Sequence, residues 1–502
     1  MTSLATIVLL LWPFLVVPVL FVVLPVRLSV FASVIFGWLF LPFARMDFAG
    51  PIELSKYGAC TLTVLACAAL FDSSRFARYR FHLLDLPMVL WVLSAPLASL
   101  TNGLGLSDAA SSLFHESVTW GIPYILGRLY ITDGASLRDL AMVLLAAGMA
   151  YVPFVLWEAR MSPRLHVQLY GFVTYAHGST ANWRFGGWRP VVFQQHGLML
   201  GLLMGSIAVL GAWMWWTGSW RRFRPLGFFQ RRGGERWGTW SGIARRAGGS
   251  SDEMSGLVLP TLPVVGVLIV VALLCRSLNA LMLMAMIGGA LVALRNPIWP
   301  TRIAMVCLLV VPILYAGNRV APSLVGVSVD KPVIEVARLL DPYRAASMQF
   351  RVESEAMLAE KAMQRPVFGW GGWGRSRVKN DYGEDVSVTD GLWIIALGTR
   401  GLFGLATWYL SMTAAVWVLV TRYPPRVLSS PEAAPAVGLA CVMLMFVIDC
   451  LPNAMVTVIH PMIAGGLSAI TVALAARADR PRVAARGAAD RGPSGVPAGA
   501  GA

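Results

Sequence analysis

Arginine residues in two parts of the chain have the chemistry to bind a phosphate or diphosphate group. Arg344 and Arg351 stand seven residues apart, and apolar residues recur at helical spacing through 345–363, which predicts an amphipathic helix with both arginines on one face. A guanidinium donates two parallel hydrogen bonds to phosphate through its planar fork. Glu355 follows Arg351 by four residues, the spacing of an ion pair on a solvated helix face. An anion site and a solvated or headgroup-facing surface are therefore both open interpretations.

A second cationic cluster precedes the apolar run 198–216. Arg184 and Arg189 each stand beside a tryptophan, and His196 follows at the start of the run. Such a cluster at the mouth of a span can attract a lipid-linked anion, with tryptophans to receive carbohydrate. It is equally typical of an aromatic belt at a membrane surface with arginines that extend to the headgroups.

Two side chains have the chemistry of a general base, which must lie within hydrogen-bond reach of the hydroxyl that it deprotonates. Asp390 stands where a polar segment meets the apolar run 391–420, and His196 opens the earlier run. Near arginines, the Asp390 carboxylate stays ionised and can accept a proton. Aspartate is also a preferred N-cap residue, so both roles are open for Asp390.

A glycine-rich segment lies between Arg351 and Asp390. Four glycines and two tryptophans occur within 369–374, and Pro366 is expected to end the preceding helix. The glycines allow tight turns whose backbone could cradle a phosphate, although a plain turn is the more common meaning of such a segment.

The composition places these groups in a membrane protein. Of 502 residues, 57% are hydrophobic and only 13% are charged, with a mean hydropathy of +0.66. Soluble proteins carry about 25% charged residues, so the soluble, disordered and fibrous classes are excluded. The net charge is +15, but the low density of charge argues against a nucleic-acid partner. The six cysteines form no C-x-x-C pair, and we expect neither disulfides nor a metal site.

Apolar runs of about 20 residues are long enough to cross a bilayer as helices. We predict an all-α fold, a polytopic membrane helix bundle of about 12–13 spans with a large, partly helical periplasmic loop. The predicted spans are 5–24, 28–44, 57–71, 86–101, 111–130, 138–157, 195–217, 257–275, 277–294, 301–317, 391–420, 434–451 and 455–476.

Basic residues in the loops orient the spans. The stretch 218–255 has eight arginines against three acidic residues, which predicts a cytoplasmic position. Alternate crossings then place 158–194 and 318–390 on the outer face. The chain is divided into N-terminal membrane helices (1–157), an outer loop and span (158–217), an Arg-rich cytoplasmic loop (218–256), membrane helices (257–317), a large periplasmic loop (318–390), C-terminal membrane helices (391–477) and a disordered tail (478–502).

The order of these pieces resembles the superfamily of bacterial O-antigen ligases and O-antigen polymerases, which are integral-membrane glycosyltransferases. Arg189 with His196 seven residues later resembles the family's Arg-(x)6-Asn pattern, and Arg351 followed by PVFGWG at 366–371 resembles its Arg … Pro-x-x-Gly-x-Gly loop. Asp390 and the following GLWI, with GLFG at 401–404, resemble the family's His-Asn-x-x-Leu … Gly-x-x-Gly signature. Asp390 stands where ligases have a histidine base, which favours polymerase-like members.

The resemblance implies a metal-independent and cofactor-free reaction on the periplasmic face of the bacterial inner membrane, in a multi-pass protein. The donor would be a glycan on undecaprenyl diphosphate, and the acceptor a glycan or lipid within the membrane lipid environment. Arg189, Arg351, Arg184 and Arg344 would bind the diphosphate, and Asp390 or His196 would be the base.

Two alternatives belong to different classes. One is an inactive or structural partner in an assembly, and the other is a transporter or flippase that moves lipid-linked or anionic cargo without chemistry. In a transporter, ionisable residues inside spans would mark the pathway. The candidates are His115, Glu116, Glu158, Arg276 and Asp449.

Overall fold

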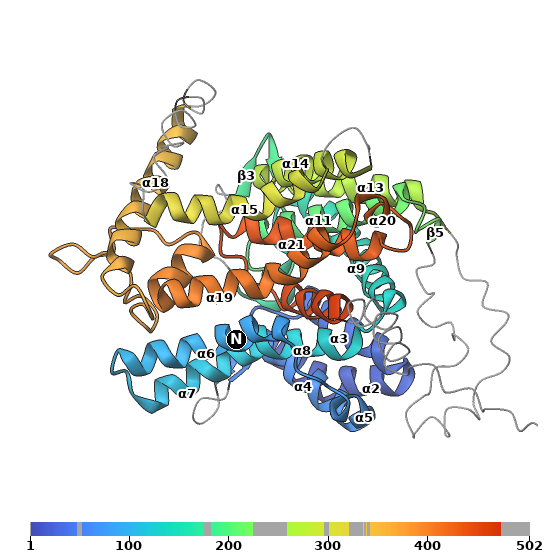
Figure 1. Cartoon of the computed structure of the whole chain (residues 1–502), viewed down its shortest axis with the longest axis horizontal. Helices are drawn as coiled ribbons and strands as arrows, with labels where there is room; N and C mark the ends of the chain where they lie inside the picture. The colour runs from blue at the N-terminus through green and yellow to red at the C-terminus, as the bar shows by residue number, and fades with distance from the viewer. Residues whose placement is uncertain are drawn as a thin grey trace, which may run out of the picture.

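The structure is a computed structural model and describes residues 2–47, 53–174, 182–223, 259–295, 301–320 and 342–472, with the single positions 335 and 338. Within this part of the chain nearly every element is a helix, and the few strands form three antiparallel pairs (Figure 1). The predicted all-α bundle is therefore confirmed. The predicted tail 478–502 and most of the Arg-rich loop 218–256 lie outside the described residues.

The N-terminal half consists of short and long helices joined by tight connections. Its helices are α1 (Ser3–Leu11), a π-helical turn η1 (Trp12–Val16), α2 (Val17–Val23), α3 (Val26–Phe40), α4 (Lys56–Phe71), α5 (Ser73–Ala77), a 3-10 turn η2 (Leu83–Asp85), α6 (Leu86–Thr101), α7 (Gly105–Glu116), a π-helical turn η3 (Ser117–Gly121), α8 (Ile122–Tyr130), α9 (Gly134–Met161) and α10 (Leu165–Tyr170). Its strands are β1 (Arg45–Asp47), β2 (Glu53–Ser55), β3 (Trp183–Arg184) and β4 (Gly187–Trp188).

The remaining helices follow from residue 197 onward. They are α11 (Gly197–Trp216), α13 (Thr261–Leu274), α14 (Leu278–Arg295), α15 (Thr301–Val320), α18 (Pro342–Met363), α19 (Leu392–Arg422), α20 (Pro425–Leu428), α21 (Ala434–Asp449) and a last helix Ile459–Val472. The pair of β5 (Arg222–Phe223) and β6 (Leu259–Pro260) adjoins α13.

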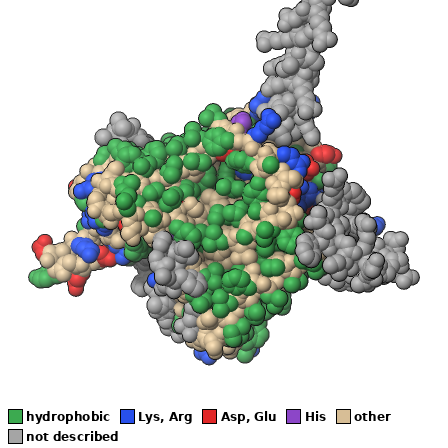
Figure 2. Space-filling model, turned by 90° about the horizontal axis from the view of Figure 1, so that it is seen from below, with side chains coloured by type: hydrophobic (Ala, Val, Ile, Leu, Met, Phe, Trp, Pro, Cys, Tyr) green, Lys and Arg blue, Asp and Glu red, His purple; other side chains and the backbone are tan. Residues whose placement is uncertain are grey.

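Seven helices in the described ranges are long and apolar enough to cross a membrane, and five further apolar helices have 10–17 residues. Large apolar side chains remain exposed on them, such as Phe14, Leu262 and Leu314. Hydrophobic side chains cover most of the face in Figure 2, and charged side chains lie mostly toward its left and right margins. Exposed apolar side chains of this kind are typical of a membrane interface, and together with the long apolar helices they identify a polytopic membrane protein.

Contacts between helix ends sort the loops into two groups. One group, here called the α18 rim, consists of 43–47, 53–57, 102–104, 162–174, 182–196, 275–279, 342–391 and 452–458. It is connected, for example, by Lys56 Nζ, which donates to the carbonyl of Phe193 (2.9 Å), and by the amide of Leu392, which donates to the carbonyl of Asn453 (3.0 Å).

The second group, here called the β5 rim, consists of 24–27, 72–85, 128–139, 216–223, 295 and 421–434. Ion pairs join it from distant parts of the chain, between Arg27 and Asp139 (2.7 Å) and between Arg128 and Asp85 (2.6 Å). When successive predicted spans cross the bundle in opposite directions, successive loops lie on opposite sides, and the two rims correspond to these two sets of loops. In Figure 1 the α18 rim lies toward the left and the β5 rim toward the right.

Helix α19 positions most of the groups considered below. The helix is interrupted at Gly401, whose φ of 65° and ψ of −166° belong to a region that is open essentially to glycine alone. The residues just before the glycine-rich segment fill the interruption, because the amides of Leu402 and Phe403 donate to the carbonyls of Pro366 and Val367. This arrangement replaces the hydrogen bonds that a continuous helix would have made.

Candidate functional site

The structure brings Arg351 and Asp390 together at the α18 rim. Arg351 projects from the middle of α18, and its Nε lies 3.1 Å from Oδ2 of Asp390. The two side chains keep 48% and 35% of their surface exposed, so a ligand can reach both. The N-cap role that was left open for Asp390 is wrong, because the N-cap of α19 is Gly391 and no side chain caps that helix.

Both helices that carry this pair are held against one another by an apolar cluster. Leu358 and Ala362 of α18 are buried against Trp393 and Leu397 in the first turns of α19. Because Leu358 follows Arg351 by two helical turns and Trp393 follows Asp390 by three residues, this contact keeps the two charged groups near one another.

The ion pair lines a cavity of about 250 Å³. Its lining residues are Tyr315, Met348, Arg351, Val352, Glu355, Val388, Asp390 and Pro452. The cavity therefore offers one guanidinium and two carboxylates around an apolar wall.

Glu355 pairs elsewhere than the sequence predicts. Its carboxylate lies 3.3 Å from Nε of Arg319 and accepts a hydrogen bond from the Tyr315 hydroxyl (2.6 Å). Burial raises the pKa of Glu355, and these two partners oppose that rise. The expected ion pair with Arg351 at a spacing of four residues is wrong, and the Arg351 guanidinium turns to Asp390 instead.

The loop that carries Arg189 and His196 is a separate, rigid structure on the same rim. Glu158 at the end of α9 accepts hydrogen bonds from the amides of Val191 (2.7 Å), Val192 (2.6 Å) and Leu165 (2.8 Å). These bonds hold Val192 at a φ of 55°, which is rare for a β-branched residue. Glu158 is thus engaged in holding this loop.

Arg189 is buried beneath the first turn of α11 and has 8% of its surface exposed. A Cβ on Gly197 would lie only 2.4 Å from its Cδ, so glycine permits this packing. Nε of Arg189 has no hydrogen-bond partner among the residues that the structure describes. Burial, with the charge of Arg184, lowers the pKa of Arg189 to about 10, and the group remains a cation at neutral pH.

His196 is the N-cap of α11, and its Nδ1 accepts the amide of Leu198 at 3.0 Å. With Glu158 and His166 it lines a small cavity of about 50 Å³. That cavity shares no lining residue with the cavity of Arg351 and Asp390. The structure therefore pairs Arg351 with Asp390 and gives His196 a capping role in a different pocket.

Of the remaining two predicted arginines, the structure describes the side chain of Arg184 but not that of Arg344. Arg184 is exposed in β3, and its carbonyl accepts a hydrogen bond from Nη1 of Arg276 at 3.2 Å. Arg344 belongs to the first turn of α18, but its side chain lies outside the described part of the structure.

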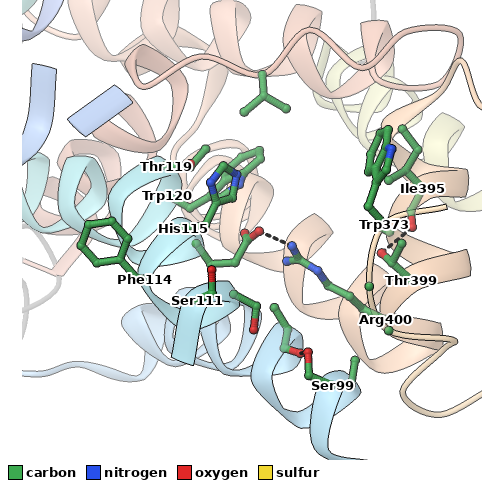
Figure 3. A pocket seen from close by; sticks show the side chains of 18 of the residues that line it. Ser99, Ser111, Phe114, His115, Thr119, Trp120, Trp373, Ile395, Thr399 and Arg400 are labelled. Atoms are coloured by element: carbon green, nitrogen blue, oxygen red, sulfur yellow. Dashed lines mark hydrogen bonds and ion pairs between the residues drawn. The ribbon is translucent and has the colours of Figure 1, made fainter. Parts of the chain in front are cut away.

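A further cavity, larger than the two above, was not expected. It has a volume of about 580 Å³ and lies between α6, α7 and η3 on one side and α19 with the glycine-rich segment on the other (Figure 3). Arg400 reaches into it, forms an ion pair with Glu116 and lies 3.8 Å above the ring of Trp91. Glu116 was proposed only as a transport residue, and Arg400 was missed. The available signal was a single arginine inside an apolar span.

The glycine-rich segment forms part of the wall of this cavity. Gly371, Gly372 and Trp373 line it, and the amide of Gly371 donates to the carbonyl of Thr399 at 3.0 Å. A Cβ on Gly369 would lie 2.5 Å from the backbone of Arg400. The glycines therefore serve a close backbone approach to the interruption in α19.

Within the described ranges, no three His, Cys, Asp or Glu residues are grouped as a metal site would require. Comparison of the sequence with family models finds no match, and comparison with curated proteins finds none either.

Proposed function

We propose that this chain is an integral-membrane glycosyltransferase that transfers or polymerises a glycan carried on undecaprenyl diphosphate. The single observation that supports it best is the meeting of Arg351 and Asp390 on the wall of one accessible cavity. One group can hold a departing diphosphate and the other can receive a proton. The sequence resemblance to O-antigen ligases and polymerases supports the same assignment.

In the proposed reaction, a hydroxyl oxygen of the acceptor forms a bond to the anomeric carbon of the donor sugar. The bond between that carbon and the diphosphate oxygen breaks, and its electron pair leaves with the diphosphate. The hydroxyl proton passes to the carboxylate of Asp390. The guanidinium of Arg351 exchanges its partner Asp390 for the diphosphate and stabilises the negative charge that develops on it.

We place the α18 rim at the periplasm of a bacterial inner membrane. The opposite β5 rim supports this orientation, because arginines outnumber acidic residues there and basic loops remain in the cytoplasm. Its arginines in the described ranges include Arg27, Arg75, Arg78, Arg80, Arg128, Arg138, Arg221, Arg222, Arg295, Arg422 and Arg426. The acidic residues of the same rim are Asp72, Asp85, Asp133, Asp139 and Glu432.

Substitution in cells tests the proposal. Arg351→Ala and Asp390→Asn should each abolish the surface glycan while the amount of membrane-inserted protein stays normal. The matched control is the ion pair of Arg377 with Asp385, which has similar exposure in the same loop. Asp385→Asn should leave the glycan unchanged. Normal glycan in both Arg351→Ala and Asp390→Asn would exclude this reaction.

Deletion of the gene separates the two forms of the reaction. Short, unpolymerised repeat units on the lipid carrier would identify a polymerase, and long chains without attachment would identify a ligase.

Transport of a lipid-linked or anionic cargo without chemistry is the second candidate. It is favoured by the ion pair of Arg400 and Glu116, because charged residues enclosed among membrane helices commonly mark a pathway. A transporter would require Glu116 and Arg400 but would retain function in Asp390→Asn.

A further inference from the structure

The cavity between α7 and α19 contains polar atoms that have no hydrogen-bond partner among the described residues. Nη1 of Arg400 and Oε2 of Glu116 are both buried and have no hydrogen-bond partner among the described residues, although the other ends of these side chains form the ion pair. Oγ1 of Thr119 in the same wall is also buried and has no hydrogen-bond partner among the described residues. Buried polar groups are nearly always paired in native proteins, and an exception calls for an unseen partner.

The unpaired atoms specify the chemistry of that partner. Nη1 of Arg400 is a donor, whereas Oε2 of Glu116 is an acceptor. A hydroxyl group both donates and accepts, so neighbouring hydroxyls on one ligand satisfy the two atoms together. Further hydroxyls from Ser99, Ser111 and Ser112 line the same space. The cavity is therefore suited to a polyhydroxylated ligand.

The arrangement of charge in the cavity disfavours a diphosphate as its occupant. Two arginines, Arg45 and Arg400, face three carboxylates, those of Glu53, Asp108 and Glu116. Arg400 is held in a buried ion pair with Glu116, whereas Arg351 keeps 48% of its surface exposed and can turn from Asp390 to a diphosphate. An uncharged ligand leaves the pair of Arg400 and Glu116 in place.

An aromatic side chain at the wall completes the pattern. Trp373 has 75% of its surface exposed, and Arg377 lies 5.3 Å from the centre of its ring. An exposed indole that is held in place offers an apolar surface to the C–H face of a sugar ring. The geometry points to a binding site for an uncharged sugar residue of the glycan, held by the hydroxyl-directed atoms of Glu116 and Arg400 and by Trp373.

This site rests on the proposed function in that the sugar belongs to the substrate glycan. The two cavities adjoin, because Asp390 lines one of them and Leu392, two residues later, lines the other. The segment after α21 also separates them, with Pro452 on one side and Ala454 on the other. A glycan bound in the larger cavity thus lies beside the segment that carries Asp390.

Binding of glycans to the purified full-length protein tests this inference without turnover. The fluorescently labelled protein in detergent micelles is applied to an array of neutral and acidic bacterial oligosaccharides, and the tightest neutral ligand is then titrated in solution. We expect binding of a neutral glycan, with affinity at least 10-fold weaker in Glu116→Gln and Trp373→Ala. Trp373 is exposed, so its replacement keeps the fold even if Glu116→Gln does not. Glu432→Gln on the β5 rim is the control with unchanged affinity.

Three results would overturn the inference: no binding of any neutral glycan, equal affinity in Trp373→Ala and the unmodified protein, or preference for acidic over neutral glycans. Failure of this binding experiment can be told apart from failure of the proposed function. Asp390→Asn should bind the glycan normally, so a protein that binds glycan through Glu116 but transfers none would retain this site and lose the proposed reaction.

Discussion

At the scale of single residues, two similar ion pairs differ in their surroundings. Arg351–Asp390 and Arg377–Asp385 join the same residue types in the same loop, with distances of 3.1 and 2.7 Å. The first pair lines a cavity together with Tyr315, whereas the second closes a turn. Ion pairs of this exposure contribute about 0–1 kcal/mol to stability, so either can be removed without loss of the fold.

This similarity gives a first prediction. Asp390→Asn should change the free energy of unfolding by no more than about 1 kcal/mol, as should Asp385→Asn. Thermal unfolding of the two variants, followed by fluorescence-detected size exclusion, measures the change. A much larger loss of stability in Asp390→Asn alone would mean that Asp390 serves the fold and not a reaction.

His166 provides a pH prediction. Burial lowers the pKa of His166 to about 4, while a histidine in the unfolded chain has a pKa of about 6.5. Between these values the unfolded chain binds the proton more readily, so the stabilising contribution of neutral His166 is complete above pH 6.5 and is lost as the pH falls toward 4. Nε2 of His166 accepts the amide of Phe43 only when the ring is neutral, whereas Nδ1 donates to the carbonyl of Phe172 in either state.

The unfolding temperature of the purified protein should therefore decrease between pH 6.5 and 4, and His166→Gln should reduce that decrease. His82→Gln replaces an exposed histidine on the β5 rim and serves as the control. An unchanged pH dependence in His166→Gln would contradict the assignment of a neutral, buried ring.

At the scale of elements, α18 and the interruption of α19 differ in how far the sequence predicts them. The helical spacing of apolar residues in 345–363 and the position of Pro366 predict a helix that the structure has at Pro342–Met363. The interruption at Gly401 has no local signal, because GLFG lies within an apolar run. It arises from contacts with Pro366 and Val367, some 35 residues earlier in the sequence, which local periodicity does not contain.

This contact gives a prediction for the substitution of Gly401. A Cβ at Gly401 would lie 2.3 Å from the carbonyl of Val367, and φ is positive there. Gly401→Ala should therefore destabilise the protein by about 1–3 kcal/mol or more. Gly288→Ala in α14 meets no atom within 4 Å and should be neutral or stabilising by up to about 1 kcal/mol. Equal unfolding temperatures for both variants would show that α19 is continuous.

For the site, as for the helices, the sequence predicts local features but not the contacts between distant segments. Residue types and helical faces predict that Arg351 and Asp390 are candidates, because charge near an apolar run is visible in the sequence. Their pairing with one another, the burial of Arg189 under Gly197 and the partnership of Arg400 with Glu116 all depend on which helices pack together. No spacing along the chain encodes these contacts, which is why Glu355 was assigned to the wrong arginine.

At the scale of the whole molecule, the two rims predict which residues are accessible from each side of the membrane. Tyr382→Cys on the α18 rim should react with a membrane-impermeant maleimide in intact spheroplasts, because Tyr382 is 90% exposed there. Glu432→Cys on the β5 rim should react only after the membrane is permeabilised. Both substitutions are made in a Cys307→Ser background, since Cys307 is the exposed native cysteine among the described residues. The opposite pattern would reverse the orientation, and labelling of both from outside would contradict the two-rim arrangement.

The most direct test of the central claim is the release of undecaprenyl diphosphate from glycan-loaded carrier by the purified full-length protein with an acceptor glycan present. The proposed reaction predicts release by the unmodified protein, a decrease of about 10²–10³-fold in Arg351→Ala and of at least about 10²-fold in Asp390→Asn, and an unchanged rate in Asp385→Asn. Release at the unmodified rate in Arg351→Ala and Asp390→Asn would contradict it.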